Sequence, residues 1–174
     1  FDKITERIEQ LCFDLDRSFI DPMKIAKKVI EGIYDGITTK ELDQLAAETA
    51  AYLSTQHPQY ATLAGRIGVS NLHKETRGCF SENIKAMFHY HNPVTGEASP
   101  LVSKELYDVV MAHAHQLDEV VSDKRDFNYD YFGFKTLEKS YLLKIDGKVA
   151  ERPQYMYMRT ALQICGSDIE GAIE

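Results

Sequence analysis

The sequence predicts a mainly α-helical fold, and three observations indicate it. Apolar residues recur at spacings of three and four along most of the chain, and several segments begin with strong helix-capping residues. Convincing strand signals are confined to two short runs that resemble a β-hairpin. With 174 residues, the chain is long enough for one large domain or two small ones.

The first two helices are predicted over residues 2–13 and from Asp21 onward. Asp21 is a favourable N-cap, and Pro22 suits the first helical position, where its missing N–H needs no partner. Gly36 is expected to end the second helix, because glycine readily adopts the backbone conformation of a helix C-terminus. The apolar faces of these helices are formed by Ile4, Ile8, Leu11 and Cys12 in the first, and by Met23, Ile25, Ala26, Val29, Ile30 and Ile33 in the second.

The segment "TTKELDQLAAETAAYL", residues 38–53, predicts a third helix with an acidic residue at an unusual place. Thr38 and Glu41 fit a capping box. At ~100° per residue, Thr39 and Asp43 share one flank of the apolar stripe, which places Asp43 at the edge of the core. Small residues lie beside Asp43 and leave room for another group to approach: Ala46, Ala47 and Ala50.

A fourth helix is predicted after "HPQY", through "YATLAGRIGVSNLHK". Its apolar stripe begins at Tyr60 and continues one turn past Asn71 into Lys74. A lysine in that position can reach water along its aliphatic stem, or it can receive an anion such as a phosphate. Asp2 and Lys3, at the start of the first helix, carry a weaker signal, because charges at a helix start are usually solvated.

Later elements follow local signals as well. Ser81 is expected to cap a short helix, "HNPVTGEASP" predicts a loop, and residues 103–121 predict one or two helices. The second half of the aromatic stretch "YDYFGFKTLEKSYLL" is expected to be helical. Asp146-Gly147 predicts the type I′ turn of the hairpin in "YLLKIDGKVAE", and "SDIE" from Ser167 predicts a final capping box after the helix in "RPQYMYMRTALQI".

Composition excludes several classes of function. The net charge of −7 argues against general nucleic-acid or anionic-membrane binding, since both need a basic face. No apolar run approaches the ~20 residues of a membrane span, and no signal peptide opens the sequence. Three widely spaced cysteines favour reduced thiols in a cytoplasmic protein. Because the chain begins with Phe1 inside a helical pattern, we expect it to be a fragment of a longer protein.

The residues alone leave the chemistry open. Asp43 is either a boundary carboxylate that complements the helix dipole, which is the more common situation, or an acceptor for a ligand. A carboxylate for sugar hydroxyls and an ammonium for phosphates are the groups that a nucleotide pocket needs. However, neither GxGxxG nor GxxxxGK[ST] occurs, so any such pocket is of another type.

Other kinds of site have weaker support in the sequence. The histidines of "FHYH" and "AHAH" lack the spacing of metal ligands, and nothing marks a catalytic residue. The aromatic residues near residue 130 favour a packed layer over the stacking of bases.

Three longer stretches carry a family resemblance: "ITTKELDQLAAETAAYL", "HPQYATLAGRIGVSNLHKET" and "DFNYDYFGFKTLEKSYLLKIDGKVAERPQYMYMR". They resemble the large subunit of eukaryotic-type class I ribonucleotide reductase over nearly the whole chain. The likeness weakens at "TALQICGSDIEGAIE", so Cys165 is not taken for a redox cysteine of the family.

The resemblance implies a large subunit that reduces ribonucleoside diphosphates to deoxyribonucleotides, together with a small radical-bearing subunit. Residues 1–78 resemble its ATP-cone, a four-helix cluster that binds ATP as activator or dATP as inhibitor, without the N-terminal hairpin of the family. Residues 79–174 resemble the helical region that precedes the catalytic barrel. The family forms homodimers and, with dATP, higher oligomers.

Site residues follow from the same resemblance. Asp43 matches the acid that contacts the ribose, Thr39 a pocket residue at the helix start, and Lys74 the lysine that contacts phosphates. Phe1, Asp2 and Lys3 match the end of the first nucleotide-contacting segment. No metal is implied. The catalytic cysteines would lie outside this chain, so the chain alone is expected to be inactive.

Two alternatives stay open at this point. One is a nucleotide-sensing cone attached to a non-enzymatic regulator, which would not continue into reductase-like sequence after residue 78. The other is a helical interaction module without a ligand. Nucleotide binding that depends on Asp43 separates the reductase interpretation from the second alternative.

Overall fold

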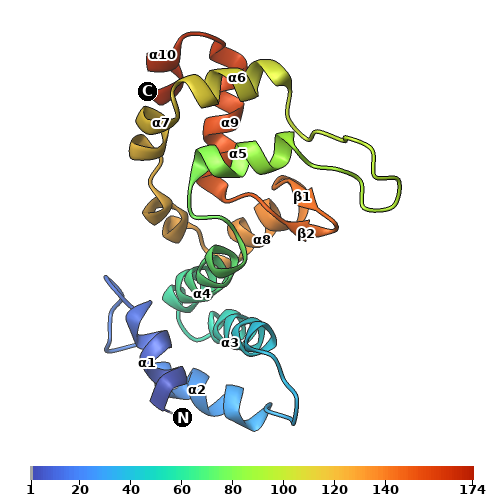
Figure 1. The fold of residues 1–174 in the computed structure, drawn as a ribbon. Helices are drawn as coiled ribbons and strands as arrows, with labels where there is room; N and C mark the ends of the chain where they lie inside the picture. Colours follow the sequence, from blue (N-terminus) through green and yellow to red (C-terminus); the bar gives the residue numbers. More distant parts are fainter. Residues whose placement is uncertain (1) are drawn as a thin grey trace. The chain divides into compact units, whose positions relative to one another are not determined.

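A computed structural model describes residues 2–174, and it is mainly helical, as the sequence predicts (Figure 1). The first elements are α1 (Asp2–Gln10), α2 (Pro22–Glu31), α3 (Thr39–Leu53), α4 (Gln59–Glu75) and α5 (Phe80–Phe88). These are followed by α6 (Lys104–Ala112), α7 (Ala114–Val120), the 3₁₀ helix η1 (Asp123–Asn128) and α8 (Tyr131–Ser140). The hairpin strands β1 (Lys144–Ile145) and β2 (Lys148–Val149) precede α9 (Pro153–Cys165) and α10 (Ile169–Ile173).

The chain forms two compact units that do not follow a single cut in the sequence. The first unit comprises the described residues up to 72 together with Asp126–Leu137, and the second comprises His73–Arg125 and Glu138–Glu174. The segment from Asp126 to Leu137 therefore returns to the N-terminal unit after more than fifty residues spent in the other one.

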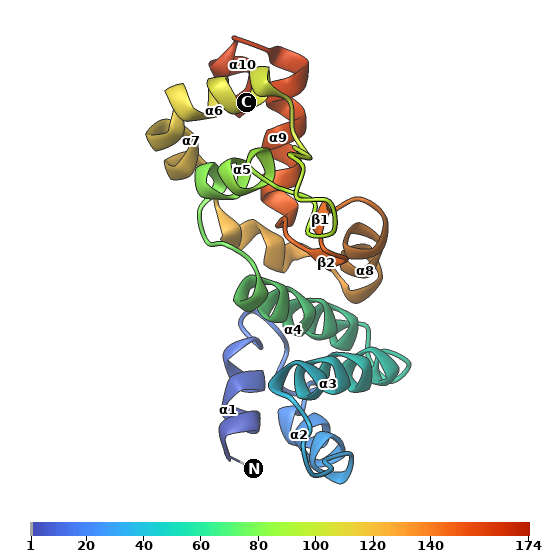
Figure 2. The same cartoon turned by 45° about the vertical axis from the view of Figure 1, so that its right-hand side comes forward.

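The first unit is built from α1 to α4 around one apolar core, with α3 and α4 side by side (Figures 1 and 2). Helix α2 packs against both α1 and α3. Small and branched side chains fill the core: Ile8, Cys12, Ile25, Ala26, Val29, Ala46, Ala47, Ala50, Leu53, Leu63 and Ile67 are all buried. Burial in this core raises the pKa of the Cys12 thiol.

Two glycines of α4 allow close packing within the first unit. A Cβ atom at Gly65 would lie 2.3 Å from the backbone oxygen of Tyr129, and one at Gly68 would lie 2.7 Å from the Phe134 ring. Phe134 is fully buried, whereas Phe132, on the same helix α8, is 81% exposed. The packed aromatic layer predicted here is therefore confirmed for Phe134 and wrong for Phe132.

The second unit has its own core, to which α5, α6, α7, α9 and α10 contribute (Figure 1). Its buried members include Phe80, Ile84, Met87, Leu106, Val110, Leu117, Tyr155 and Leu162. Phe80 and Tyr155 meet edge to face, with ring centroids 5.8 Å apart. Burial raises the pKa of the Tyr155 hydroxyl.

Turns and loops agree with their sequence signals. Asp146 and Gly147 both have positive φ, 50° and 76°, which is the conformation that a type I′ turn requires. The strands pair antiparallel, with Lys144 opposite Val149. The predicted loop is the long excursion between α5 and α6 (Figure 1), where Asn92 Oδ1 accepts from the Val94 N–H at 2.8 Å.

Helix ends confirm some predictions and correct others. Asp21 caps α2, since its side chain accepts from the Met23 N–H. Gly36 was predicted to end α2, but the helix ends at Glu31 with Gly32 as its C-cap, and Gly36 serves a turn with φ of 88°. At α10, the capping side chain is Asp168 and not Ser167, because Asp168 accepts from the Gly171 N–H.

The prediction that Ser81 caps α5 is wrong. The helix begins at Phe80, so Ser81 lies inside its first turn and is buried. Residue Cys79 holds the N-cap position without making a side-chain cap bond. The cap comes from another helix, because Asp118 of α7 accepts from the Ser81 N–H at 2.8 Å.

No helix in residues 2–174 is both long and apolar enough to cross a membrane.

Candidate functional site

The first unit contains a cavity of ≈ 360 Å³ between its helices. One part of its wall is apolar and is formed by Ile4, Ile8, Leu11, Val29, Leu42, Ala46 and Ile67. The other part is polar and is formed by Lys3, Arg7, Thr39, Asp43 and Ser70. A mostly apolar hollow with a few convergent polar groups is the usual form of a small-molecule site.

The capping box at the start of α3 positions the polar wall. Thr38 Oγ1 accepts from the Glu41 N–H at 3.2 Å, and Glu41 Oε2 accepts from the Thr38 N–H at 2.8 Å. Tyr34 adds a hydrogen bond from its hydroxyl to Glu41 at 3.0 Å. The Thr38 N–H, the Thr38 hydroxyl and the Tyr34 hydroxyl together lower the pKa of the Glu41 carboxyl. With the helix start fixed, Thr39 and Asp43 follow one turn apart on the side that faces the cavity.

Asp43 is a buried acid, with 7% of its surface exposed. Arg7 of α1 donates from Nη2 to Asp43 Oδ2 at 2.6 Å. A buried carboxylate is stable only when it is paired or hydrogen-bonded, and Arg7 provides such a partner. The pair also joins α1 to α3 across the polar wall of the cavity.

The sequence-predicted residues are distributed unevenly around this cavity. Lys3, Thr39 and Asp43 all line it, whereas Asp2 and Lys74 are not among the described residues of its wall. Lys74 lies one helical turn beyond Ser70, which does line the cavity. Phe1 lies outside the described residues. Of the alanines expected to leave room beside Asp43, Ala46 lines the cavity, but Ala47 and Ala50 are packed in the core.

Sequence reasoning missed Arg7 as a residue of this wall. Arg7 follows Lys3 at a spacing of four in α1, so the two side chains share one face of the helix. That spacing was available in the sequence. It gave no indication of the cavity, however, because the partner carboxylate lies on another helix.

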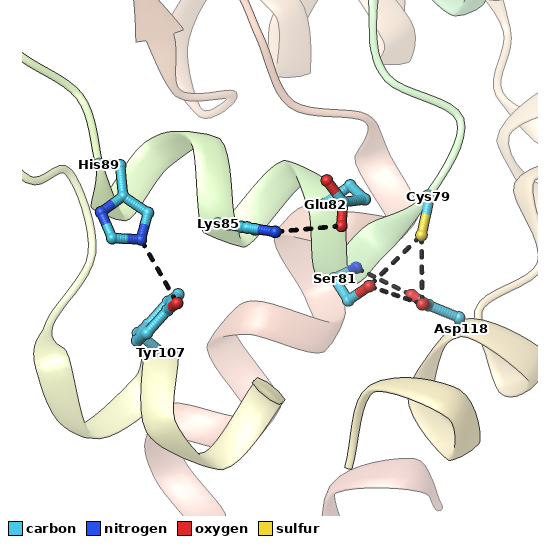
Figure 3. Close-up of polar contacts among 7 residues, drawn as sticks. All are labelled: Cys79, Ser81, Glu82, Lys85, His89, Tyr107 and Asp118. Atoms are coloured by element: carbon cyan, nitrogen blue, oxygen red, sulfur yellow. Dashed lines mark hydrogen bonds and ion pairs between the residues drawn. The ribbon is translucent and has the colours of Figure 1, made fainter. Parts of the chain in front are cut away.

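The second unit holds a different polar cluster, shown in Figure 3, around the N-terminus of α5. The Ser81 hydroxyl donates to Asp118 Oδ2 at 2.6 Å, and the Cys79 thiol donates to the same oxygen at 3.1 Å. Because the Asp118 carboxylate also accepts the Ser81 N–H, this cluster is explained as a helix cap.

Histidines do not build a metal site in the part of the chain that is described. Within residues 2–174, no group of three or more His, Cys, Asp or Glu side chains is placed to hold a metal ion. His89 contacts the Tyr107 hydroxyl at 3.3 Å (Figure 3), and His115 lies 3.5 Å from Glu119 on the surface of α7.

Comparisons with known proteins define the class of this cavity-bearing unit. Residues 1–75 match the family model described as the ATP cone domain, and residues 127–174 match the model described as "Ribonucleotide reductase, all-alpha domain". Residues 1–75, which include every described residue of the cavity wall, thus belong to an ATP-cone domain, and residues 127–174 belong to an all-alpha domain of the ribonucleotide reductase type. The chain belongs to the family of ribonucleoside-diphosphate reductase large subunits.

Individual relatives agree along the entire chain. It is 57% identical over 174 residues to the ribonucleoside-diphosphate reductase large chain of Schizosaccharomyces pombe. Identity is 56% to the large subunit of Danio rerio and 59% to that of Variola virus, again over 174 residues. Each match covers 100% of this chain but only 22% or 23% of the relative, so the chain spans about a fifth of the length of these proteins.

Proposed function

We propose that the cavity of the first unit binds ATP or dATP and that this binding regulates a ribonucleoside-diphosphate reductase. The observation that carries the proposal is the convergence of Lys3, Thr39 and Asp43 on one apolar cavity inside the segment that matches an ATP cone. In the parent protein, the reaction would be the reduction of ribonucleoside diphosphates to deoxyribonucleotides, with a small radical-bearing subunit as partner.

The residues of the wall suit the parts of a purine nucleotide. The apolar side chains, among them Ile4, Leu42 and Ile67, offer a surface against which a base can pack. The Asp43 carboxylate is an acceptor for sugar hydroxyls, and a charged acceptor makes strong hydrogen bonds. Lys3 supplies a positive charge for the phosphate groups.

The remaining predicted contacts belong to the same proposal. Lys74 would reach the phosphates from its position one turn beyond Ser70 on α4. Asp2 and Phe1 are proposed as further contacts of the nucleotide. The proposed boundary of the cone stays at residue 78, with residues 79–174 forming the helical region that follows.

Regulation by two effectors requires two states of the parent protein that bind ATP and dATP with different affinities. We assign the active state to ATP and the inhibited, higher-oligomeric state to dATP. The homodimer would be the unit that assembles. The continuation into a reductase-type domain at residues 127–174 favours this proposal over a cone attached to a non-enzymatic regulator.

Calorimetric titration with ATP and dATP tests the proposal. Asp43→Asn keeps the size of the side chain but removes its charge, so the Kd for ATP is expected to rise about tenfold or more. The matched control is Glu48→Gln on the exposed side of the same helix, which should leave the Kd unchanged. An unchanged Kd in Asp43→Asn would remove Asp43 from the site, and an absence of binding by the unmodified chain would contradict the proposed function.

A further inference from the structure

Arg7 is a charged residue of the cavity wall to which the family resemblance assigns no role. It lines the cavity together with Asp43, and the two form an ion pair of 2.6 Å between Nη2 and Oδ2. The side chain of Arg7 is 37% exposed and that of Asp43 is 9% exposed. The acid is therefore the desolvated member of the pair, and the arginine is the member that reaches solvent.

This asymmetry determines what each residue can do for a ligand. A carboxylate with little access to water needs charged or hydrogen-bonding partners to stay ionised and in one orientation. A guanidinium fixes a carboxylate more firmly than an ammonium does, because its donors lie in one rigid plane. Arg7 and Asp43 lie on different helices, so their ion pair also fixes the distance between α1 and α3 at the polar wall.

We propose that Arg7 is a positioning residue of the effector site, holding the Asp43 carboxylate in the orientation in which it accepts a nucleotide's sugar hydroxyl. The inference rests on the proposed function, because it takes the cavity as a nucleotide site. It goes further by assigning the affinity for the sugar to the pair and not to the acid alone. In this proposal, Arg7 affects nucleotide affinity only through Asp43, and other cations contact the phosphates.

A double-mutant cycle separates this role from direct contact with the phosphates. The measurement is the Kd for ATP, by calorimetry, of the unmodified chain, Arg7→Gln, Asp43→Asn and the double variant. If Arg7 acts through Asp43, each single variant raises the Kd by about tenfold or more, and the double variant is no worse than Asp43→Asn. If Arg7 contacts the phosphates instead, the two losses multiply, and the proposal is overturned.

Two further variants show whether a weaker affinity for ATP arises from the positioning role of Arg7 or from a loss of folding. Arg7→Lys retains the charge but not the planar donor group, so it should recover part of the affinity that Arg7→Gln loses. Arg17→Gln removes an arginine of the same unit from a solvent-exposed pair with Glu9, whose atoms are 3.4 Å apart, and should not alter the Kd. Circular dichroism of all variants must show the helical content of the unmodified chain.

The possible results distinguish the positioning role of Arg7 from the proposed function of the cavity. ATP binding that is unchanged in Arg7→Gln, while Asp43→Asn weakens it, contradicts the positioning role and leaves the proposed function intact. Failure of the unmodified chain to bind ATP contradicts both. Equal losses in Arg7→Gln and Asp43→Asn without further loss in the double variant support the assignment.

Discussion

Arg66 is a buried cation whose guanidinium donates hydrogen bonds to backbone oxygens of the first unit. It is 7% exposed, and its Nη1 donates to the carbonyls of Leu11 at 3.0 Å and of Phe13, while Nε donates to the Phe127 carbonyl at 3.4 Å. Its guanidinium carbon also lies 3.7 Å from the centre of the Phe13 ring. One side chain of α4 thus holds the residues that directly follow α1 by hydrogen bonds. Helix α1 is the helix that carries Lys3 and Arg7.

Replacing Arg66 tests how much its hydrogen bonds contribute to the stability of the fold. Arg66→Lys keeps a positive charge but cannot reach several carbonyls at once, so buried acceptors lose their partners. We expect the free energy of unfolding to fall by about 2–3 kcal/mol, measured by urea denaturation. Arg17→Lys, at a site where both members of the ion pair are half exposed, is the control and should change stability little. A similar stability of Arg66→Lys and the unmodified chain would contradict this account.

Helix starts differ in whether their caps are local. For α3, the donors and acceptors lie within four residues of each other, at Thr38 and Glu41, so the sequence predicts the cap correctly. For α5, the capping carboxylate is Asp118, 37 residues away from Ser81. No sequence pattern near Ser81 contains this information, which explains why the expected Ser81 cap is wrong.

The α3 cap gives a prediction with a defined pH dependence. Thr38→Ala removes the oxygen that accepts the Glu41 N–H and is expected to lower the free energy of unfolding by about 1 kcal/mol at neutral pH, by urea denaturation. Thr38→Ser keeps that oxygen and should retain most of the stability.

The sign of the pH effect follows from the lowered pKa of Glu41. A carboxyl with a lower pKa in the folded state stabilises the fold fully above its unfolded pKa, which is about 4.3 for glutamate. That contribution is lost as the pH falls through the folded pKa. The stability difference between Thr38→Ala and the unmodified chain should therefore shrink in acid. If the stability difference between Thr38→Ala and the unmodified chain grows in acid, the hydrogen bonds between Thr38 and Glu41 are not its source.

At the scale of the whole molecule, segments that are far apart in the sequence pack into the same compact unit. Residues 126–137 belong to the N-terminal unit, although residues 73–125 build the other one. Gly65 and Gly68 make room for this returning segment on α4, and Phe134 is its fully buried anchor. The compact unit that carries the cavity is therefore assembled from two separate stretches of sequence.

This assembly predicts a strong effect of one distant residue on the first unit. Phe134→Ala leaves a cavity against Gly68 and should lower the free energy of unfolding by about 3–5 kcal/mol, measured by urea denaturation of the full chain. Amide hydrogen exchange of α4 should accelerate in the same variant. Phe132→Ala, on the exposed side of the same helix, should change stability by no more than about 0.5 kcal/mol. Equal effects of the two variants would contradict the packing described.

By itself, the sequence determined the helical class, the hairpin, the α3 cap and the family, because each depends on neighbouring residues or on the identity of long stretches. It also indicated Lys3, Thr39 and Asp43, whose side chains meet at one cavity. Only the tertiary structure decided that Arg7 pairs with Asp43, that Asp118 caps α5 and that Phe134 completes the first unit. These contacts join residues 36, 37 and 66 positions apart, and a helix pattern of a few residues carries no information on which distant segment will pack against it.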